Sequence, residues 1–359
     1  LTLYERIRSR SEVKKVILGN IEISDLVPAL VIPEIGINHA GSLAVAKEMV
    51  DSAHRAGACL IKHQTHICSD EMSNIARKII PGNADVSIYD IMEQCALNEE
   101  EELELKAYVE SLGMLFLSTP FSRAAAERLE KFGVHAYKIG SGEMNNYPLV
   151  EHIAEYGKPM IVSTGMNDLK AIETCIKIME KHGVPYALMH TTNLYPTKPE
   201  QVRLGAMTSM MEAFPGIPIG LSDHTLNNNA CIAAIAQGAC LVERHYTDHM
   251  RRKGPDIVCS MDEENLKLLL QAAQELFLMR GGEKKALKEE QVTIDFAYAS
   301  VVSIQSIKRG ECFSKENLWV KRPGTGEIPA KDFETLLGKK ALRDITKDTL
   351  IGWDMVEGQ

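Results

Sequence analysis

The chain repeats one local pattern eight times: a short apolar run, then a segment with apolar residues at helical spacing. Each run is rich in Ile, Leu or Val and bounded by turn residues, which is typical of a buried parallel strand. The segments between runs, such as 42–57 and 168–183, end at Gly, a common helix stop. Eight strand–helix units predict an α/β fold, a (β/α)8 TIM barrel over residues 30–282. The runs cover residues 30–37, 58–65, 114–120, 136–142, 159–165, 186–192, 217–223 and 240–246.

Smaller elements flank the predicted barrel. Residues 1–29 are predicted to be an N-terminal extension with a β-hairpin, because two β-prone runs surround Gly19-Asn20. The charged stretch 283–298 is predicted to be a linker, and 299–359 a β-rich domain that is small enough to need docking on the barrel or on a partner subunit. The long connection between the second and third runs is predicted to form a lid or a substrate wall.

Composition excludes some functions. The net charge of −9 argues against nucleic-acid binding through phosphate contacts. No apolar stretch reaches the roughly 18 residues of a membrane span, so we expect no membrane partner. The eight cysteines are scattered without a Cys-x-x-Cys pair, which predicts buried free thiols, Cys59 and Cys240 among them, and a cytoplasmic location. Because the chain starts with Leu, we expect residues to precede it.

Polar residues stand in or just after all eight runs. In a barrel the carboxyl ends of the strands face one pocket, so these side chains are expected to converge there. They are Glu34; Lys62 and Gln64; Ser118 and Thr119; Lys138, Ser141 and Glu143; Ser163 and Thr164; Asn193 and Tyr195; Ser222 and His224; and Glu243 and His245.

The chemistry of this set indicates an anion site beside a metal site. Lys62 and Lys138 in buried strands are unfavourable unless they are paired or bind something, and with Ser and Thr hydroxyls they suit carboxylate and phosphate groups. Glu243 and His245 share a strand face and, with His224, could hold a divalent ion directly or through water. The alternative is that both lysines belong to an inert ion-pair layer.

Several long motifs resemble one family. "PEIGINHAGSLAVAKEMVDSAHRAGACLIKHQTH", "YKIGSGEMNNYPL", "GLSDHT" and "ERHYTD" closely resemble the bacterial N-acetylneuraminate (sialic acid) synthases. The tail "RGECFSKENLWVKRPGTG" resembles that family's C-terminal SAF, or antifreeze-like, domain. The resemblance covers nearly the whole chain from about residue 16. It implies condensation of phosphoenolpyruvate with N-acetylmannosamine and water, giving N-acetylneuraminate and phosphate.

The resemblance also implies roles for individual residues. His224 and His245 would bind a divalent metal, with Mn²⁺ favoured over Mg²⁺ or Co²⁺. The amino sugar would contact Tyr195, Asp256 and Phe296, and Arg322 would reach it from the partner subunit of a homodimer with exchanged C-terminal domains. Phosphoenolpyruvate would contact Lys62, Thr119, Lys138, Ser141, Ser163, Asn193 and Ser222.

The proposed chemistry leaves some alternatives open. Glu34 and Glu143 are candidates for positioning water or moving protons, and which is the base stays undecided; Glu243 would orient a metal-bound group. A Schiff-base aldolase would instead use Lys62 or Lys138 as a nucleophile. A non-catalytic carbohydrate-binding protein, and a legionaminate or pseudaminate synthase acting on a 6-deoxy diacetamido sugar, are further alternatives. The insertion motif "KIIPGNADVSIY" resembles the branch that uses N-acetylmannosamine.

Overall fold

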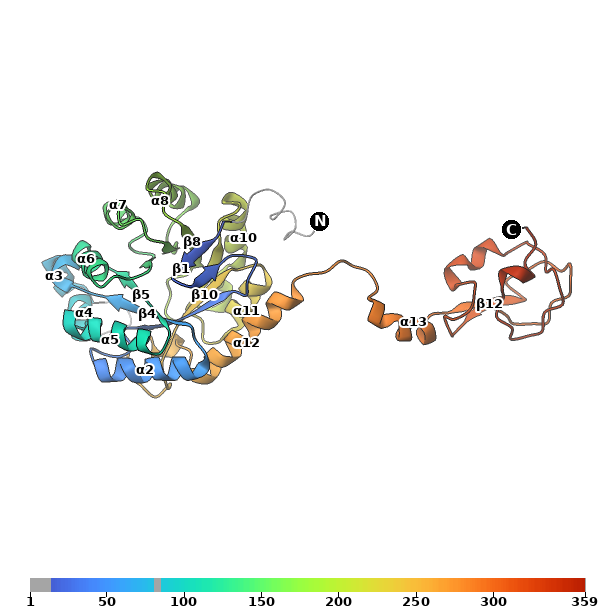
Figure 1. Ribbon diagram of the computed structural model, residues 1–359, viewed down its shortest axis with the longest axis horizontal. Helices are drawn as coiled ribbons and strands as arrows, with labels where there is room; N and C mark the ends of the chain where they lie inside the picture. Colours follow the sequence, from blue (N-terminus) through green and yellow to red (C-terminus); the bar gives the residue numbers. More distant parts are fainter. Residues whose placement is uncertain (1–13, 81–84, 359) are drawn as a thin grey trace. The chain divides into compact units, whose positions relative to one another are not determined.

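The computed structural model describes residues 14–80 and 85–358 (Figure 1). The chain divides into two compact units between Gly281 and Gly282. Residues 1–13 of the predicted N-terminal extension lie outside the described residues.

The first unit is built on a closed barrel of parallel strands, as predicted (Figure 1). The hydrogen-bonded order is β10-β3-β4-β5-β6-β7-β8-β9, so strands that follow one another in the chain are neighbours and the last closes on the first. Every predicted run contains one of these strands. They are β3 (Leu30–Gly36), β4 (Leu60–Thr65), β5 (Leu115–Pro120), β6 (Tyr137–Ile139), β7 (Met160–Ser163), β8 (Tyr186–Thr191), β9 (Ile219–Asp223) and β10 (Leu241–His245).

Helices follow each barrel strand, and local signals set several of their ends. In α5, for example, Asn98 and Glu101 form a reciprocal capping box. At the end of α2, Gly57 adopts φ 96°, a left-handed conformation that favours glycine. The helices of this unit are α2 (Leu43–Ala56), α3 (Cys68–Glu71), α4 (Ile88–Cys95), α5 (Glu99–Ser111), α6 (Arg123–Lys131), α7 (Tyr147–Ala154), α8 (Leu169–Lys181), α9 (Pro199–Val202), α10 (Leu204–Ala213), α11 (Asn229–Ala236) and α12 (Glu263–Met279), with 3-10 turns η1 (Asn74–Lys78) and η2 (Ile257–Cys259).

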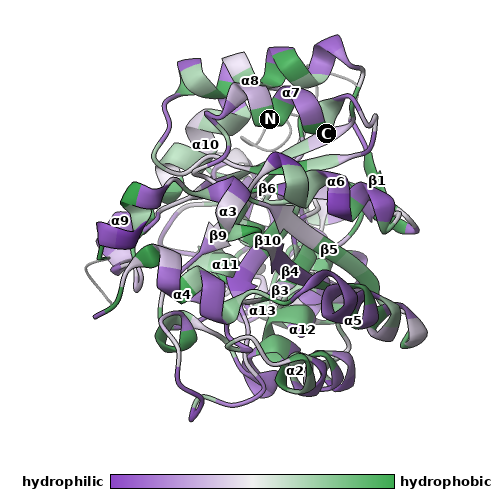
Figure 2. Ribbon diagram, turned by 90° about the vertical axis from the view of Figure 1, so that its left-hand side faces the viewer, coloured by the Kyte–Doolittle hydropathy of each residue, from purple (hydrophilic) through white to green (hydrophobic). Residues whose placement is uncertain are grey.

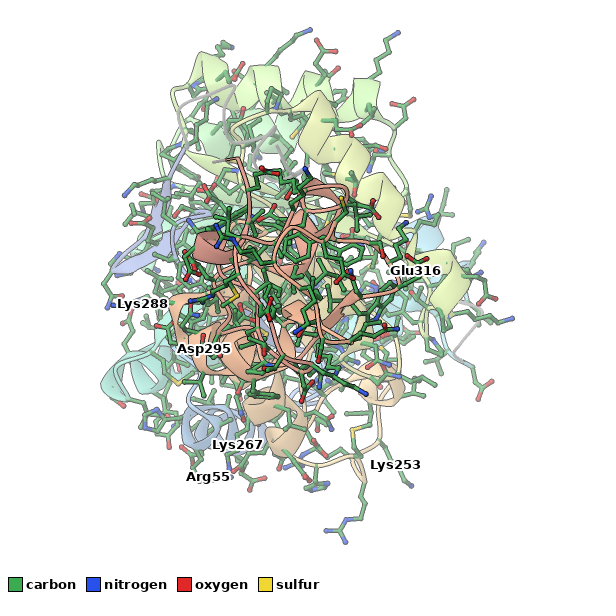
Figure 3. The ribbon with its side chains drawn as sticks, turned by 90° about the vertical axis from the view of Figure 1, so that its right-hand side faces the viewer. Arg55, Lys253, Lys267, Lys288, Asp295 and Glu316 are labelled. Atoms are coloured by element: carbon green, nitrogen blue, oxygen red, sulfur yellow. The ribbon has the colours of Figure 1, made fainter. Side chains whose placement is uncertain are left out.

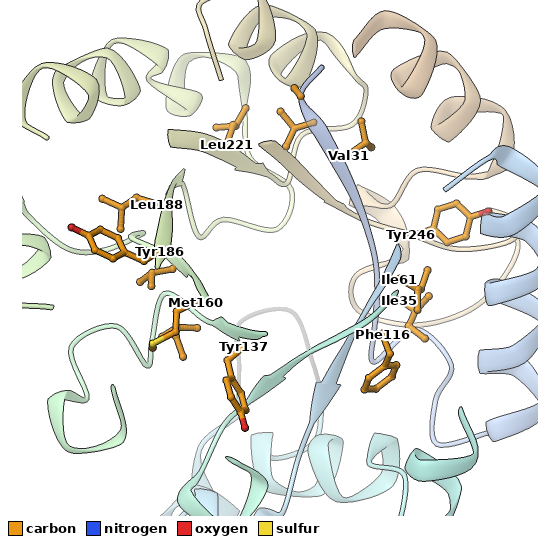
Figure 4. Close-up of a cluster of buried hydrophobic side chains, with 14 of the residues drawn as sticks. Val31, Ile35, Ile61, Phe116, Tyr137, Met160, Tyr186, Leu188, Leu221 and Tyr246 are labelled. Atoms are coloured by element: carbon orange, nitrogen blue, oxygen red, sulfur yellow. The ribbon is translucent and has the colours of Figure 1, made fainter. Parts of the chain in front are cut away.

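Alternation along the strands separates two cores. Outward side chains such as Ile61 and Phe116 pack beneath the helices in the larger core (Figure 4). Inward side chains such as Leu60 and Leu117 form a second core inside the barrel. The predicted hairpin, β1 (Val16–Leu18) paired antiparallel with β2 (Ile21–Ile23), adds its buried residues to this inner core. The hairpin packs on residues near the strand starts, so it closes that end of the barrel and leaves the carboxyl ends for the site.

Burial, rather than surface charge, holds the helices on the barrel. In Figure 2 the helices alternate between hydrophilic and hydrophobic residues around the central strands. Surface ion pairs are present: Glu263 of α12 lies 2.9 Å from Arg55 of α2 and 2.7 Å from Lys267, and both basic residues are labelled in Figure 3. Exposed pairs of this kind contribute about 1 kcal/mol or less each.

The second unit is small and rich in β-structure, as predicted. Strand β11 (Ser300–Ser303) pairs antiparallel with β12 (Leu318–Lys321), and Phe313 and Ile328 lie in its separate core. The segment predicted as a linker contains η3 (Lys288–Glu290) and α13 (Gln291–Ala297), and the 3-10 turns η4 (Ala330–Thr335) and η5 (Trp353–Met355) follow. Helix α13 is bonded to this unit, because the Gly324 amide donates to the Asp295 carbonyl over 2.7 Å.

Two other predictions concern cysteines and membranes. The prediction that Cys59 is buried is wrong: it is exposed just before β4, whereas Cys240 is buried. An apolar run does not fix burial where the chain enters a strand, because the side chain there can face the open end of the helix layer.

Among the described residues, no helix is both long and apolar enough to cross a membrane.

The predicted lid holds α3, η1 and α4, with residues 81–84 outside the described residues. Its role as a lid stays a prediction.

Candidate active site

A pocket of about 210 Å³ opens at the carboxyl ends of the barrel strands. Most of the side chains that the sequence predicts to converge line this pocket, with Asp256 outside the lining. The prediction is wrong for Ser118 and Thr164, which do not line it. Ser118 is adjacent to Thr119 and so faces the other side of its strand, where its hydroxyl contacts Thr65, and the Thr164 hydroxyl donates to the Met189 carbonyl. The lining residues are Glu34, Lys62, Gln64, Thr119, Phe121, Lys138, Gly140, Ser141, Gly142, Glu143, Ser163, Thr191, Asn193, Tyr195, Ser222, His224, Glu243 and His245.

Two lysines and two carboxylates form a buried charge network at the pocket floor. Lys62 donates to Glu34, and its Nζ lies 3.6 Å from Glu243 Oε1. Lys138 Nζ also lies 3.6 Å from Glu243 Oε1 and donates to Ser163 Oγ over 2.6 Å. Both lysines therefore have carboxylate partners. The sequence alone had left open whether these lysines are paired within the protein.

The network sets different protonation behaviour for the two lysines. Burial alone would lower the pKa of Lys62, but Glu243 and Glu34 raise it above its ordinary value. Burial lowers the pKa of Lys138 against the pull of Glu243, with Lys62 adding to the decrease. Lys62 therefore stays protonated. The protonated form of Lys138 would be stabilised more than that of Lys62 by an anion bound in the pocket.

Several buried polar atoms in the pocket lack a partner. Glu243 Oε2, Thr119 Oγ1, Asn193 Oδ1 and His245 Nδ1 make no hydrogen bond. Unsatisfied buried polar atoms cost about 1–3 kcal/mol each, and in native proteins they often mark a place that a ligand or ion fills. The pocket floor is therefore prepared for polar groups from outside the chain.

His224 and His245 lie side by side at the ends of β9 and β10. Their ring centroids are 5.3 Å apart, and the Tyr195 ring lies 4.1 Å from His224. Burial, and then the nearby His245, lower the pKa of His224 to about 3. His224 Nδ1 lies 2.9 Å from the Thr192 carbonyl and donates to it, which leaves Nε2 as the nitrogen with a free lone pair.

The residues present fit a divalent metal held by two imidazoles. Orienting one ring nitrogen through a backbone carbonyl is a common arrangement for ligating histidines, and His224 has it. Within residues 14–80 and 85–358, no three His, Cys, Asp or Glu side chains converge as a complete metal-binding group. Remaining ligands would therefore come from substrate or water, with the unpaired Glu243 Oε2 and His245 Nδ1 nearby.

A buried ion pair behind the pocket lies next in sequence to both histidines. Arg244 and Asp223 are register partners on β10 and β9, and each precedes a histidine in the chain. Arg244 Nε lies 3.4 Å from Asp223 Oδ2, and its guanidinium donates to the Thr225 carbonyl over 2.6 Å. The outward pair ties the two strands together while their neighbouring histidines face the pocket.

Glu143 differs from Glu34 in its surroundings. It lies on the loop after β6, over Gly140, where a side chain would collide with its carboxylate. Burial raises the pKa of Glu143 to about 7. Lys62 and Gln64 donate to Glu34, which therefore stays ionised, so the two carboxylates are suited to different proton-transfer roles.

The remaining predicted residues lie outside the pocket lining. Asp256 is at its edge, with Oδ2 3.8 Å from His245 Nδ1. Phe296 and Arg322 are exposed in the second unit, Phe296 on α13. The sequence assigned no individual role to the lining residues Gln64, Phe121, Gly140, Gly142 and Thr191. Gln64 lies two residues after Lys62 and so shares its strand face, a signal that could have assigned it a role.

Comparison with known proteins identifies the family. The NeuB family pattern matches residues 49–285, and the SAF domain pattern matches residues 298–357. The chain belongs to the NeuB family. It is therefore a sugar-acid synthase of the family that joins phosphoenolpyruvate to a sugar.

Relatives of this NeuB-family chain differ in their sugars. An N,N'-diacetyllegionaminic acid synthase of Campylobacter jejuni is 36% identical, over 90% of this chain and 98% of the relative. Human N-acetylneuraminate-9-phosphate synthase is 30% identical, over 92% and 93%. A crystal structure of N-acetylneuraminic acid synthetase from Leptospira borgpetersenii shares 28% identity and a TM-score of 0.72, over 79% of this chain and 96% of that one.

Proposed function

We propose that the protein condenses phosphoenolpyruvate with N-acetylmannosamine and water to give N-acetylneuraminate and phosphate. The observation that carries the proposal is the single pocket in which Lys62 and Lys138 lie beside the paired imidazoles of His224 and His245. Cations, hydroxyls and a metal-binding pair in one place suit a phosphorylated carboxylate next to a sugar aldehyde.

Phosphoenolpyruvate binding is assigned to the lysine side of the pocket. Lys138 and Ser163 are already hydrogen-bonded, and Ser141 Oγ accepts from the Gly165 amide over 3.1 Å. The unpaired Thr119 hydroxyl faces the same space, and Asn193 and Ser222 complete the set. Fixed donors in a buried site stabilise the substrate carboxylate and the phosphate that leaves.

The reaction forms a C–C bond and a C–O bond to water, and it breaks the C–O bond to phosphate. C3 of phosphoenolpyruvate attacks the aldehyde carbon, water adds at C2, and the tetrahedral intermediate collapses to the C2 ketone as phosphate departs by C–O cleavage. The water oxygen loses both protons: one is balanced by the proton that the aldehyde oxygen gains, and the other leaves with phosphate. Glu34, ionised by its donors, is proposed to accept the proton from water, and Glu143, with its pKa raised to about 7, to supply one.

His224 and His245 are proposed to hold the metal, Mn²⁺ in preference to Mg²⁺ or Co²⁺. When bound, a divalent ion supplies Lewis acidity toward the sugar aldehyde. Glu243 would orient a group near the ion through its unpaired Oε2, since its Oε1 already accepts from Ser222 over 3.2 Å. Tyr195 and Asp256, on the same side as the histidines, are proposed to contact the sugar.

The second unit is proposed to complete the sugar site of a partner subunit in a homodimer. Phe296 and Arg322 are both exposed, and the Asp295–Gly324 bond ties their segments together within this unit. If Arg322 enters a partner's pocket, Phe296 enters with it. Exposed aromatic and arginine side chains are typical of residues that bury on association.

A second candidate acceptor is a 6-deoxy diacetamido sugar, as for a legionaminate or pseudaminate synthase. The 36% identity with the Campylobacter jejuni legionaminic acid synthase favours it. The insertion motif that includes "KIIPGNADVSIY" favours N-acetylmannosamine instead. Both sugars would present an aldehyde and an N-acetyl group to the same barrel residues.

Phosphate release distinguishes these functions. Purified protein is given phosphoenolpyruvate, Mn²⁺ and one sugar at a time: N-acetylmannosamine, its 6-phosphate, or either 6-deoxy diacetamido sugar. We expect release with N-acetylmannosamine above all. Turnover with a diacetamido sugar alone would replace the primary proposal by the second, and no sugar-dependent release would support a non-catalytic carbohydrate-binding protein.

Chelation and borohydride separate the metal reaction from a Schiff-base aldolase. The metal mechanism predicts loss of activity with chelator, recovery with Mn²⁺, and no covalent labelling on borohydride treatment with substrate. Lys62, held by two carboxylates that raise its pKa, is a poor amine nucleophile. Labelling at Lys62 or Lys138 with chelator-resistant activity would refute the metal mechanism.

A further inference from the structure

A chain of hydrogen bonds links helix α3 to the Glu34 carboxylate. Glu71 Oε2 lies 2.8 Å from His66 Nδ1, and His66 Nε2 lies 3.0 Å from Gln64 Oε1. Gln64 Nε2 then donates to Glu34 Oε1 over 2.8 Å. The His66 ring is buried and stacks on Phe121, with centroids 4.3 Å apart and planes inclined by 17°. The hydrogen bonds therefore run without a break from Glu71 to Glu34.

The chemistry of each group fixes the direction of each bond. An ionised Glu34 only accepts, so the Gln64 side turned toward it is the amide NH₂. The Gln64 carbonyl therefore faces His66, and His66 Nε2 must carry a proton to donate to it. Glu71, if ionised, also only accepts, so His66 Nδ1 must carry a second proton. The arrangement requires a doubly protonated imidazolium at His66 paired with the Glu71 carboxylate.

We propose that His66 and Glu71 are positioning residues: the imidazolium, held by Glu71, orients the Gln64 amide so that its NH₂ group fixes the Glu34 carboxylate. The inference rests on the proposed function, in which Glu34 accepts the proton from water. Lys62 occupies the same Glu34 oxygen from the barrel side. The two donors together leave Glu34 Oε2 directed toward the histidine pair, 4.0 Å from His245 Nε2.

Loss of one proton from the His66–Glu71 pair would undo this orientation. A neutral His66 keeps its remaining proton on Nδ1, because the Glu71 carboxylate accepts it there. The bare Nε2 would then face the Gln64 carbonyl, acceptor against acceptor, and the amide would turn over. Its carbonyl would face the Glu34 carboxylate, and that carboxylate would lose a donor. Activity is therefore expected to fall on the alkaline side.

The charged groups around His66 come from several elements. Glu71 comes from α3, and Glu143, on the loop after β6, interacts electrostatically with His66. His39, after β3, opposes a second positive charge, and burial already lowers its pKa to about 3, so it stays neutral. Glu34 does not contact His66 directly, because Gln64 lies between them in the series of hydrogen bonds.

Two variants and a matched control test the proposal. His66→Leu removes the donor to Gln64, whereas Glu71→Gln places an amide NH₂ against Nδ1 and lets a neutral His66 keep its proton on Nε2. The control is His182→Leu: His182 Nε2 also pairs with a glutamate, Glu151 Oε1 at 2.6 Å, but it ends α8 and does not line the pocket.

The variants are expected to differ in kcat and in pH profile. His66→Leu should lower kcat about 10- to 100-fold, the range typical of lost orienting partners, with the KM for phosphoenolpyruvate within about twofold of wild type. Glu71→Gln should retain most activity and lose the alkaline decline of the wild type. His182→Leu should change neither. A kcat within about twofold for His66→Leu, or an unchanged alkaline decline in Glu71→Gln, would overturn the proposal.

A spectroscopic readout keeps this test separate from the proposed function. In protein labelled with ¹⁵N-histidine, the His66 signals, assigned by their absence from His66→Gln, should show protons on both ring nitrogens near neutral pH. A singly protonated ring would overturn the inference even if the enzyme is active. If the wild type releases no phosphate with any sugar, the proposed function fails and the spectrum alone decides the inference. Should His66→Leu fail to fold, the Glu71→Gln profile and the spectrum still decide it.

Discussion

Replacing Arg244 by methionine should destabilise the barrel strongly and weaken metal binding at a distance. Arg244 is 2% exposed and Asp223 3% exposed, and the guanidinium also donates to Asn228 Oδ1 over 2.7 Å and to the Cys259 carbonyl over 3.2 Å. Arg244→Met leaves the Asp223 carboxylate buried without its cation. Breaking a buried pair in this way costs about 3–5 kcal/mol, or roughly 10²- to 10⁴-fold in the unfolding equilibrium.

Urea unfolding measures the free energy of unfolding of each variant, and calorimetry measures its Mn²⁺ affinity. The double variant Asp223→Asn with Arg244→Met should recover about 1 kcal/mol or more relative to the sum of the single variants, because neither charge is then stranded. Arg55→Met, at an exposed pair with Glu263, is the control and should cost about 1 kcal/mol or less. At a temperature where Arg244→Met is folded, its Mn²⁺ affinity should fall about 10- to 100-fold, since the pair holds both histidine strands.

Two results would refute this reasoning. Arg244→Met could lose no more stability than Arg55→Met, which would mean that Asp223 is not stranded in the folded state. The double variant could be as unstable as the two single losses added together, which would mean that the residues act independently. Either outcome would remove the basis for a coupling between the outer ion pair and His224 and His245.

Three further predictions address the pocket and its surroundings. His224→Gln should abolish Mn²⁺ binding in calorimetry and phosphate release while leaving the melting temperature within a few degrees; retained activity would contradict the metal assignment. Mixing inactive His224→Gln with inactive Arg322→Ala protein, with subunits allowed to exchange, should restore up to about a quarter of wild-type activity if the second units are exchanged in a dimer, and none if each chain completes its own pocket. Burial, and then His63, lower the pKa of His39 to about 3, below its unfolded value of about 6.5. The contribution of the neutral His39 ring to the free energy of unfolding is therefore complete above pH 6.5 and is lost as the pH falls toward 3. Going from pH 7 to pH 5 should therefore cost the wild type about 2 kcal/mol more than His39→Gln in urea unfolding, and equal losses would show that His39 is not buried as a neutral ring.

The sequence by itself determined the barrel and the membership of its site. Apolar runs of strand length alternating with helical segments leave few folds other than a (β/α)8 barrel, and parallel strands deliver their carboxyl ends to one face. For this reason the sequence alone groups residues as distant in the chain as Glu34 and His245. Because successive side chains of a strand face opposite sides, His63 points away from the Lys62 side, and its Nδ1 lies 3.3 Å from Glu102.

Only the tertiary structure decided which of these groups neutralise one another. Lys62 pairs with Glu34 and Glu243, Arg244 with Asp223, and His66 with Glu71. Such pairings depend on distances of a few ångströms between side chains from different elements, and charge interactions in a buried site change steeply over that range. Spacing along the chain carries no information on those distances. The sequence could therefore specify which residues meet in the pocket, whereas their protonation and orientation follow from packing.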